Sequence, residues 1–168
     1  MQKSIYISYN PNSTKEEHIA HDLYRKGRQN GYFIYLPVRG IHKNITLQTK
    51  ANIDNSDWFV VFSTSELTAT VKEEIEYAFN KKDDSQVIII YSHHYGKNID
   101  FQGKKPIEMY VDDYDLNKLE KFKNDLFTKI TPKKNSIQKN EGVNGLKVLL
   151  GVGAAILLLN ALTSDNNE

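Results

Sequence analysis

The sequence contains no cysteine and almost no net charge, and both absences exclude classes of function. Without cysteine the chain forms no disulfide and offers no thiolate nucleophile, iron–sulfur cluster or Cys-ligated zinc site. Its 22 Lys and Arg balance 21 Asp and Glu, so a net charge of +1 gives no field that would attract a phosphate backbone. We therefore expect no nucleic acid among its partners. The length of 168 residues suits one domain with a short remainder.

Several common catalytic signatures are also missing. No GxGxxG, P-loop, HExxH, GxSxG or EF-hand pattern occurs, which argues against the usual phosphate-binding loops and hydrolase turns. His18 and His21 lie three residues apart on a predicted helix, a spacing that can share a metal, but no carboxylate has a matching spacing. We therefore expect no metal.

What the sequence does contain is an alternation of strands and helices over residues 1–131. Apolar and β-branched runs predict the strands, and helical stripes of apolar residues predict the helices. The predicted strands are 4–9, 32–37, 58–64, 86–92 and 105–111. The predicted helices are 14–31, 45–53, 71–80 and 116–130. This alternation is typical of an open, doubly wound α/β fold with a parallel sheet.

The carboxyl ends of the predicted strands form the edge where we expect a ligand, because doubly wound folds bind ligands where the strand order reverses. In this chain the edge is polar and aromatic, and it is short of charges. Its members are Ser8, Tyr9, Asn10, the loop with Arg39 and Gly40, and Ser63 to Ser65.

An acidic cluster opens the predicted helix 71–80, directly after a strand that ends in hydroxyl residues. Among its three glutamates, Glu74 is flanked by the inward-facing Val71, Ile75 and Ala78. A carboxylate at the edge of an apolar face can lose enough water to take part in chemistry. The alternative is that acidic residues near a helix N-terminus simply complement the helix dipole. The spacing alone leaves both interpretations open.

The chain changes character after residue 131. Residues 132–144 are polar and begin with proline, as expected of a linker, residues 145–163 are mostly apolar, and residues 164–168 form a polar tail. The run 148–162 carries no charge, with lysines before it and acidic residues after it. As a single membrane anchor it would leave the first domain in the cytoplasm. The alternative is a soluble helix that docks or oligomerises through the same leucines.

Three motifs occur in a fixed order along the chain. They are IYISYN at 5–10, IDNSDWFVVFSTS at 53–65 and EEIEYA at 73–78. Together they resemble the Toll/interleukin-1 receptor (TIR) domain, in particular the small bacterial TIR-like proteins of the Thoeris antiphage class. The resemblance extends over roughly residues 3–131. It implies the flavodoxin-like fold of that family, with a five-stranded parallel sheet.

The resemblance implies an enzyme that cleaves NAD⁺ between nicotinamide and ribose. The catalytic glutamate of the family lies four residues before a helix alanine, which corresponds here to Glu74 and Ala78. Its role would be to stabilise positive charge on the ribose in the transition state. Capture by water would give ADP-ribose, and capture within the molecule a cyclic isomer. NAD⁺ would be the substrate, no cofactor would be needed, and a downstream effector would sense the product in antiphage defence.

The resemblance also assigns residues around the site. The loop 37–44 corresponds to the BB loop of the family, which gates the site and mediates assembly of TIR domains with one another. Thr70 stands where many active members carry tryptophan, and the turn 10–14 replaces an acidic residue that follows the first strand in the family. The predicted substrate-binding residues are Ser8, Tyr9, Asn10, Arg39, Gly40, Ser63, Ser65 and Thr70.

Two other interpretations stay open. Nucleoside 2-deoxyribosyltransferases have a similar first strand and a helix that supplies a nucleophilic glutamate, and Asp57 with residues 74–78 partly matches them. A TIR domain can also act without catalysis, as an adaptor that assembles at a membrane. Release of nicotinamide from NAD⁺ would distinguish the three.

Overall fold

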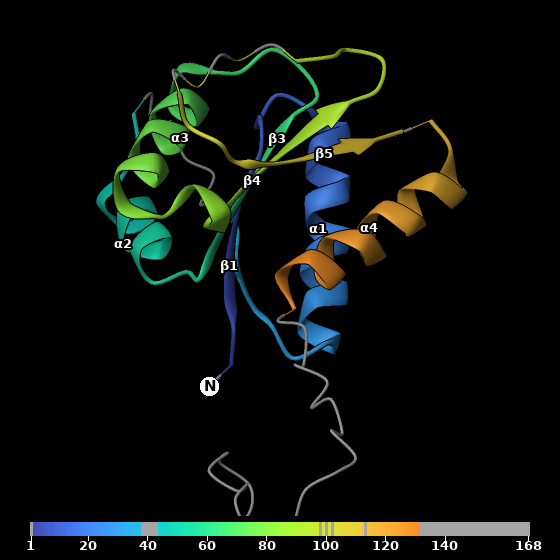
Figure 1. The fold of residues 1–168 in the computed structure, drawn as a ribbon, viewed down its shortest axis with the longest axis horizontal. Coiled ribbons are helices and arrows are strands. Elements are labelled where there is room, and N and C mark those ends of the chain that lie inside the picture. The colour runs from blue at the N-terminus through green and yellow to red at the C-terminus, as the bar shows by residue number, and fades with distance from the viewer. Residues whose placement is uncertain are drawn as a thin grey trace, which may run out of the picture. The chain divides into compact units, whose positions relative to one another are not determined.

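The computed structural model describes residues 2–37, 44–97, 99, 101, 103–112 and 114–131. Strands and helices alternate along this part of the chain, as the sequence predicts (Figure 1). The strands are β1 (Ser4–Ser8), β2 (Phe33–Tyr35), β3 (Trp58–Ser63), β4 (Val87–Ser92) and β5 (Ile107–Val111). The helices are α1 (Thr14–Gln29), α2 (Leu47–Asp54), α3 (Ala69–Lys81), α4 (Leu116–Ile130) and a short 3₁₀ turn η1 (Asp84–Gln86).

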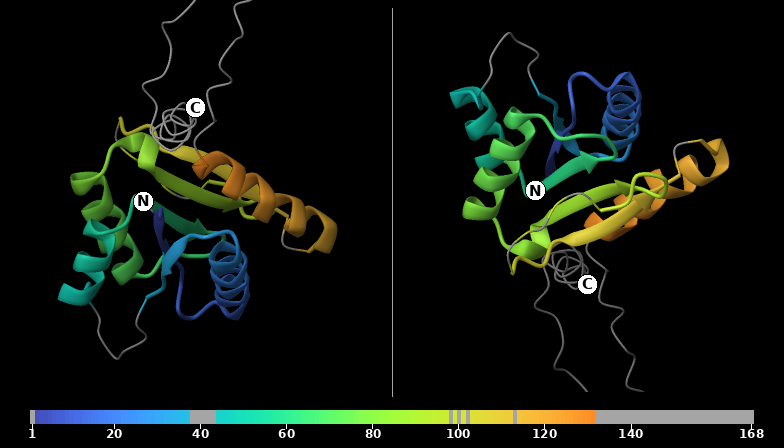
Figure 2. Two further views of the ribbon diagram at one scale, coloured as in Figure 1. Left: turned by 90° about the horizontal axis from the view of Figure 1, so that it is seen from below. Right: turned by 90° about the horizontal axis from the view of Figure 1, so that it is seen from above.

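The five strands form one parallel sheet with the order β2-β1-β3-β4-β5. Helices α1 and α4 cover one face of the sheet, and α2 and α3 cover the other (Figures 1 and 2). The predicted doubly wound, five-stranded parallel sheet is therefore confirmed, with a flavodoxin-like strand order. The order reverses between β1 and β3, so a ligand crevice is expected beyond the carboxyl ends of these two strands.

The side chains of β1 alternate between the two faces of the sheet. Ile5 and Ile7 belong to the core under α1 and α4, whereas Tyr6 belongs to the core under α2 and α3. Ser8 follows Tyr6 at the strand period of two, so it faces the same helices. Like β1, β3 and β4 are buried along almost their whole length, as expected of parallel strands covered on both faces.

Helix α3 begins at a cap that the sequence supplies. The Thr68 hydroxyl accepts a hydrogen bond from the backbone N–H of Val71, which satisfies one of the free donors of the first turn. Val71, Ile75 and Ala78 then bury the inner side of the helix against the sheet. Glu74 lies on this buried side, so the packing of α3 carries a carboxylate into the core.

The connection from β4 to β5 contains no helix among its described residues. It crosses the α3 side of the sheet, where Ile99 and Phe101 pack on the core. Gly96 and Gly103 have φ angles of 73° and 89°, which side chains rarely tolerate, and they allow the turns at its two ends. The crossover thus adds side chains from irregular backbone to the core on this face of the sheet.

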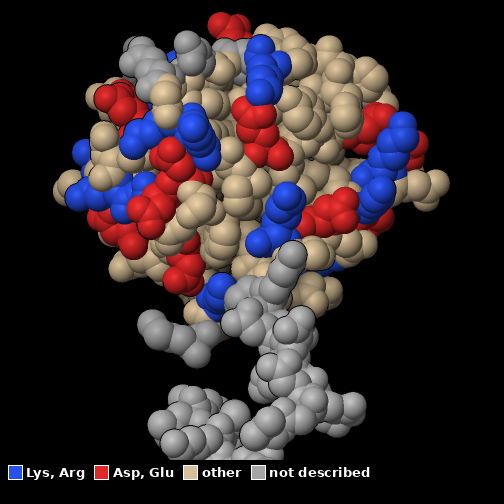
Figure 3. Space-filling model, in the orientation of Figure 1, with Lys and Arg blue, Asp and Glu red and all other residues tan. Residues whose placement is uncertain are grey.

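No helix in the part of the chain that the structure describes has the length and apolar character needed to cross a membrane. The predicted linker 132–144, apolar helix 145–163 and tail 164–168 lie outside the described residues. The membrane anchor and its soluble alternative both stay predictions. On the face drawn in Figure 3, basic and acidic residues are interspersed rather than gathered by sign.

Candidate functional site

The candidate site lies at the carboxyl ends of β1 and β3, where two acidic side chains are buried. Glu74 reaches this edge from α3, and Glu16 reaches it from the first turn of α1. They are 3% and 1% exposed, respectively. The expectation that this edge is short of charges is wrong, because two helices, α1 and α3, each bring a buried carboxylate to it. Only Glu74 is among the residues that the sequence singles out.

Glu74 is held by two hydroxyl groups from β1. The Tyr6 hydroxyl donates to Oε1 at 3.1 Å, and the Ser8 hydroxyl donates to Oε2 at 2.5 Å. Among the described residues, no Lys, Arg or His forms an ion pair with this carboxylate. Its negative charge is thus desolvated and hydrogen-bonded, yet not neutralised by a cation.

The environment shifts the proton affinities of this cluster in one direction. Burial raises the pKa of the Glu74 carboxyl, and Glu73 adds repulsion, while the hydrogen bonds from Ser8 and Tyr6 only partly oppose these effects. Burial and the neighbouring Glu74 charge raise the pKa of the Tyr6 hydroxyl far above its ordinary value. Tyr6 therefore stays a neutral hydrogen-bond donor, whereas Glu74 is a carboxylate with an unusually high affinity for a proton.

Glu16 is held at the same strand ends by a different set of donors. Its Oε2 accepts a hydrogen bond from the Asn10 N–H at 2.7 Å. Its Oε1 accepts from the Thr64 hydroxyl at 2.7 Å, the Ser65 hydroxyl at 2.9 Å and the Thr64 N–H at 3.3 Å. An acidic residue therefore does serve the end of the first strand, although it comes from α1 rather than from the turn 10–14. That the turn 10–14 replaces the acidic residue of the family stays a prediction.

The other residues that the sequence singles out fall into three groups. Asn10 and Ser65 meet beyond the ends of β1 and β3: the Asn10 side chain donates to the Ser65 hydroxyl at 3.3 Å and to the Glu66 carbonyl at 2.8 Å. Ser63 is buried at the end of β3, and Thr70 is half-buried one turn before Glu74 in α3.

Tyr9 alone forms the second group. It is 3% exposed and packs in the core under α1 and α4, on the sheet face opposite Tyr6. The third group consists of Arg39 and Gly40, which lie outside the described residues.

Sequence reasoning missed Tyr6 and Glu16, and it placed Thr64 at the edge without assigning it a role. Tyr6 reads as one more apolar residue of a strand, and only the period-two pairing with Ser8 indicates that both face one helix. A hydrogen bond also links the hydroxyls of Thr49 and Tyr6, so α2 joins the same cluster. No group of three or more His, Asp or Glu in the described part of the chain is arranged to hold a metal ion.

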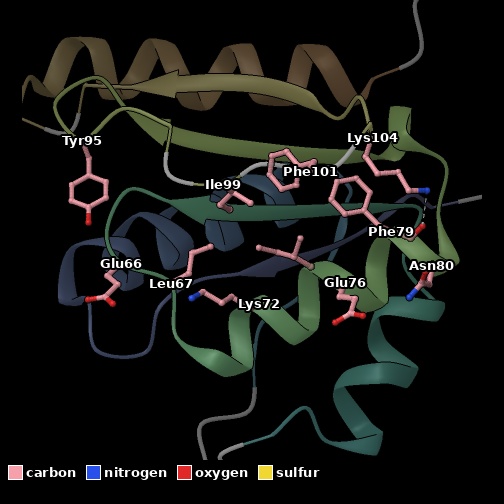
Figure 4. A pocket seen from close by; sticks show the side chains of 11 residues that line it. Glu66, Leu67, Lys72, Glu76, Phe79, Asn80, Tyr95, Ile99, Phe101 and Lys104 are labelled. Atoms are coloured by element: carbon pink, nitrogen blue, oxygen red, sulfur yellow. Dashed lines mark hydrogen bonds between the residues drawn. The ribbon is translucent and has the colours of Figure 1, made fainter.

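A separate cavity of about 560 Å³ lies along the other flank of α3 (Figure 4). Apolar side chains such as Leu67, Phe79 and Phe101 line it, and Glu76 and Lys104 stand at its rim. Its charged residues are all exposed, and Glu74 does not line it. We place the candidate site at the buried carboxylates instead, because desolvated charge is what shifts proton affinity and stabilises charged transition states.

Comparisons with known proteins show the fold and no more. No protein-family model and no curated protein matches the sequence significantly. A CMP N-glycosidase of Clostridium botulinum has a similar structure, with a TM-score of 0.53 and 16% identity over 75% of this chain and 99% of that one. The flavodoxin-like domain of a Synechococcus protein is similar with a TM-score of 0.51 and 10% identity, over 71% of this chain and 91% of that one. A diflavin flavoprotein of Nostoc is similar with a TM-score of 0.50 and 8% identity, over 73% of this chain and 88% of that one.

Proposed function

We propose that this protein cleaves an N-glycosidic bond of a nucleotide, and that its substrate is NAD⁺, cleaved between nicotinamide and ribose. The observation that carries the proposal is Glu74: a carboxylate 3% exposed, held by two hydroxyls and unpaired with any described cation. Cleavage of this bond develops positive charge on the ribose ring. A desolvated negative charge without a cation of its own is complementary to that charge.

The proposed reaction needs little from the protein beyond this charge and a shaped crevice. The bond between C1′ and the nicotinamide nitrogen breaks, and its electron pair leaves with nicotinamide as a neutral molecule. The cation at C1′ is stabilised by the Glu74 carboxylate while Tyr6 and Ser8 hold that carboxylate in place. Addition of water and loss of a proton gives ADP-ribose. Attack by a nucleophile of the same molecule, followed by loss of a proton, gives a cyclic isomer.

Two lines of support converge on this chemistry. The sequence resemblance to TIR domains selects Glu74 as the catalytic residue and NAD⁺ as the substrate. The fold is also similar to that of a CMP N-glycosidase, and that protein acts on the bond between a base and its ribose phosphate. The ribosyl–pyrimidine bond of CMP is therefore the second candidate, and a deoxyribosyl transfer between bases is the third.

The remaining parts of the proposal concern partners. We propose that TIR-like domains of this protein assemble with one another through the loop 37–44 during antiphage signalling. A downstream effector would sense the nucleotide product, and the C-terminal segment would anchor the domain to a membrane. A non-enzymatic adaptor at a membrane is the alternative to the enzyme.

The deciding experiment measures base release by the purified full-length chain. NAD⁺, CMP and a deoxynucleoside with a second base are incubated separately, and products are identified by chromatography and mass spectrometry. We expect nicotinamide from NAD⁺, and a rate at least about 100-fold lower for Glu74→Gln, which keeps the shape and removes the charge.

Glu76→Gln is the matched control, because Glu76 is exposed on the same helix and makes the same change of charge. Its rate should stay within about twofold of wild type, as expected for an exposed position away from the site. Equal turnover by the wild type and Glu74→Gln would remove the catalytic role of this carboxylate. Absence of turnover even at high protein concentration would leave the adaptor.

A further inference from the structure

In the sequence, Glu16 has the position of an ordinary helix-capping residue. Ser13 and Glu16 form the pattern S-x-x-E, in which the glutamate normally returns to the backbone N–H of the serine. Half of the pattern is present, because the Ser13 hydroxyl accepts from the Glu16 N–H at 3.3 Å. The Ser13 N–H, however, donates to the carbonyl of Asn10 at 3.0 Å. The carboxylate of Glu16 is thereby released from local capping and available for another contact.

That other contact joins the ends of β1 and β3, where the topology predicts a ligand crevice. Oε2 binds the Asn10 N–H after β1, and Oε1 binds the N–H and hydroxyl of Thr64 after β3. A fourth donor, the Ser65 hydroxyl, also binds Oε1 and in turn accepts from the Asn10 side chain. The carboxylate thus spans the point where the strand order reverses.

The burial of Glu16 shows that this contact is costly to form and depends on its donors. The carboxylate is 1% exposed, and its partners among the described residues are N–H and O–H groups rather than Lys, Arg or His. A buried carboxylate without a cation persists only where several hydrogen bonds replace its water. Its hydrogen bonds all run to protein groups, and at 1% exposure it has almost no surface to offer a substrate.

We propose that Glu16 is a positioning residue, which fixes the separation of the loops after β1 and β3 and so shapes the crevice beside Glu74. It acts through Asn10 and Ser65, two of the predicted substrate-binding residues. Glu74 stabilises the charge that develops in the proposed reaction, whereas Glu16 fixes the positions of the loops around it. The part of this inference that concerns substrate rests on the proposed function, but the bridge between the loops does not.

Glu16→Gln tests the bridge, because the two backbone N–H donors bind different oxygens of the carboxylate. An amide has only one oxygen, and its nitrogen carries two hydrogens. In either orientation, one backbone N–H, of Asn10 or of Thr64, then faces another donor. Glu17→Gln is the matched control: the same change one residue later, at a half-buried carboxylate 3.8 Å from the His21 ring.

Hydrogen exchange of the full-length chain, followed by mass spectrometry, measures whether Glu16 holds the two loops together, and it needs no substrate. For Glu16→Gln we expect exchange in peptides covering residues 9–12 and 62–66 to accelerate roughly tenfold or more, since a buried donor loses its acceptor. Peptides from β4 and α4 should keep the wild-type rate, as should all peptides of Glu17→Gln. Unchanged exchange at both loops would overturn the inference, and so would a uniform acceleration across the sheet, which indicates general destabilisation.

The kinetic arm uses NAD⁺ turnover. We expect Glu16→Gln to raise KM about tenfold and to change kcat less. The loops after β1 and β3 would move apart, while Tyr6 and Ser8 would still hold Glu74 in place. A fall in kcat with KM unchanged would contradict a role in shaping the crevice. If the wild type turns over no NAD⁺, the proposed function fails, and the exchange experiment still decides whether Glu16 joins the two loops.

Discussion

The Glu74→Gln substitution separates the charge of the buried carboxylate from its shape, and we expect it to stabilise the protein. The glutamine amide has the same size, and its oxygen can accept a hydrogen bond from one hydroxyl while its nitrogen donates to the other. Tyr6 and Ser8 can each donate or accept, so both contacts survive the change. What disappears is a negative charge at a side chain that is 3% exposed.

The sign and size of this effect follow from the pKa of Glu74, which burial raises above the ordinary value of a glutamate carboxyl. Below that value the carboxyl is neutral in both states, so wild type and variant should be equally stable. As the pH rises, the unfolded chain loses its proton first, and wild-type stability falls by up to about 1.4 kcal/mol per pH unit. The loss is complete above the folded pKa and amounts to about 1.36 kcal/mol for each unit of elevation.

Unfolding of the full-length chain, followed by circular dichroism in urea and on heating from about pH 4 to about pH 8, measures this difference. For a domain of this size, each 1 kcal/mol corresponds to roughly 3 °C in Tm. The curve for Glu76→Gln should run parallel to that of the wild type, because Glu76 is exposed. A Glu74→Gln variant that is no more stable than wild type at about pH 8 would refute the reasoning. The two hydroxyls would then outweigh the cost of burial.

Three smaller substitutions test other parts of the structure, each by urea denaturation. Ser8→Ala removes the shorter hydrogen bond to the buried carboxylate. It should cost about 1.5 kcal/mol or more near neutral pH and less at about pH 4, where that carboxyl is protonated; a loss independent of pH would contradict it. Gly27→Ala would place a Cβ 2.2 Å from the Ile34 side chain. Overpacking of about 2 kcal/mol should exceed the helix propensity of roughly 1 kcal/mol, so a stabilised variant would be the contrary result. Tyr91→Phe removes a buried hydroxyl with no hydrogen-bond partner among the described residues and should stabilise by about 1 kcal/mol. A loss of stability would reveal a partner.

The fold was predictable because its signals are long and repeated. β3 and β4 read as continuous apolar runs, which is the pattern of parallel strands buried on both faces. Boundaries were less certain: β2 covers only Phe33–Tyr35 of the predicted 32–37, because Pro37 lacks the N–H that a ladder needs. The sequence also predicted helix 45–53 two residues early. The Thr46 hydroxyl caps the helix, so α2 begins at Leu47.

The site was predictable only where a residue breaks a pattern. Glu74 is an acid among inward-facing residues of a helix, and that conflict marks it in the sequence. Glu16 shows no such conflict, because an acid in the first turn of α1 already has a local explanation in capping and the helix dipole. Its partners Thr64 and Ser65 lie almost 50 residues away, with separations of 48 and 49. Only the register of β1 against β3 brings them together.

In the protein without substrate, the Glu74 carboxylate is enclosed by hydroxyl groups, and its burial disfavours its negative charge. Under the proposed function, the enclosure and the unfavourable charge are connected. Both oxygens of Glu74 are occupied by hydroxyls of β1, so a substrate ribose must approach the carboxylate alongside Ser8 or replace its hydroxyl. Burial that raises the pKa of Glu74 is an electrostatic cost in the free protein. The cost falls when positive charge appears on the ribose, which happens as the glycosidic bond breaks. The carboxylate therefore binds the transition state more strongly than the ground state in proportion to the charge that develops near it. Such a difference, rather than tight binding of the substrate, lowers the barrier.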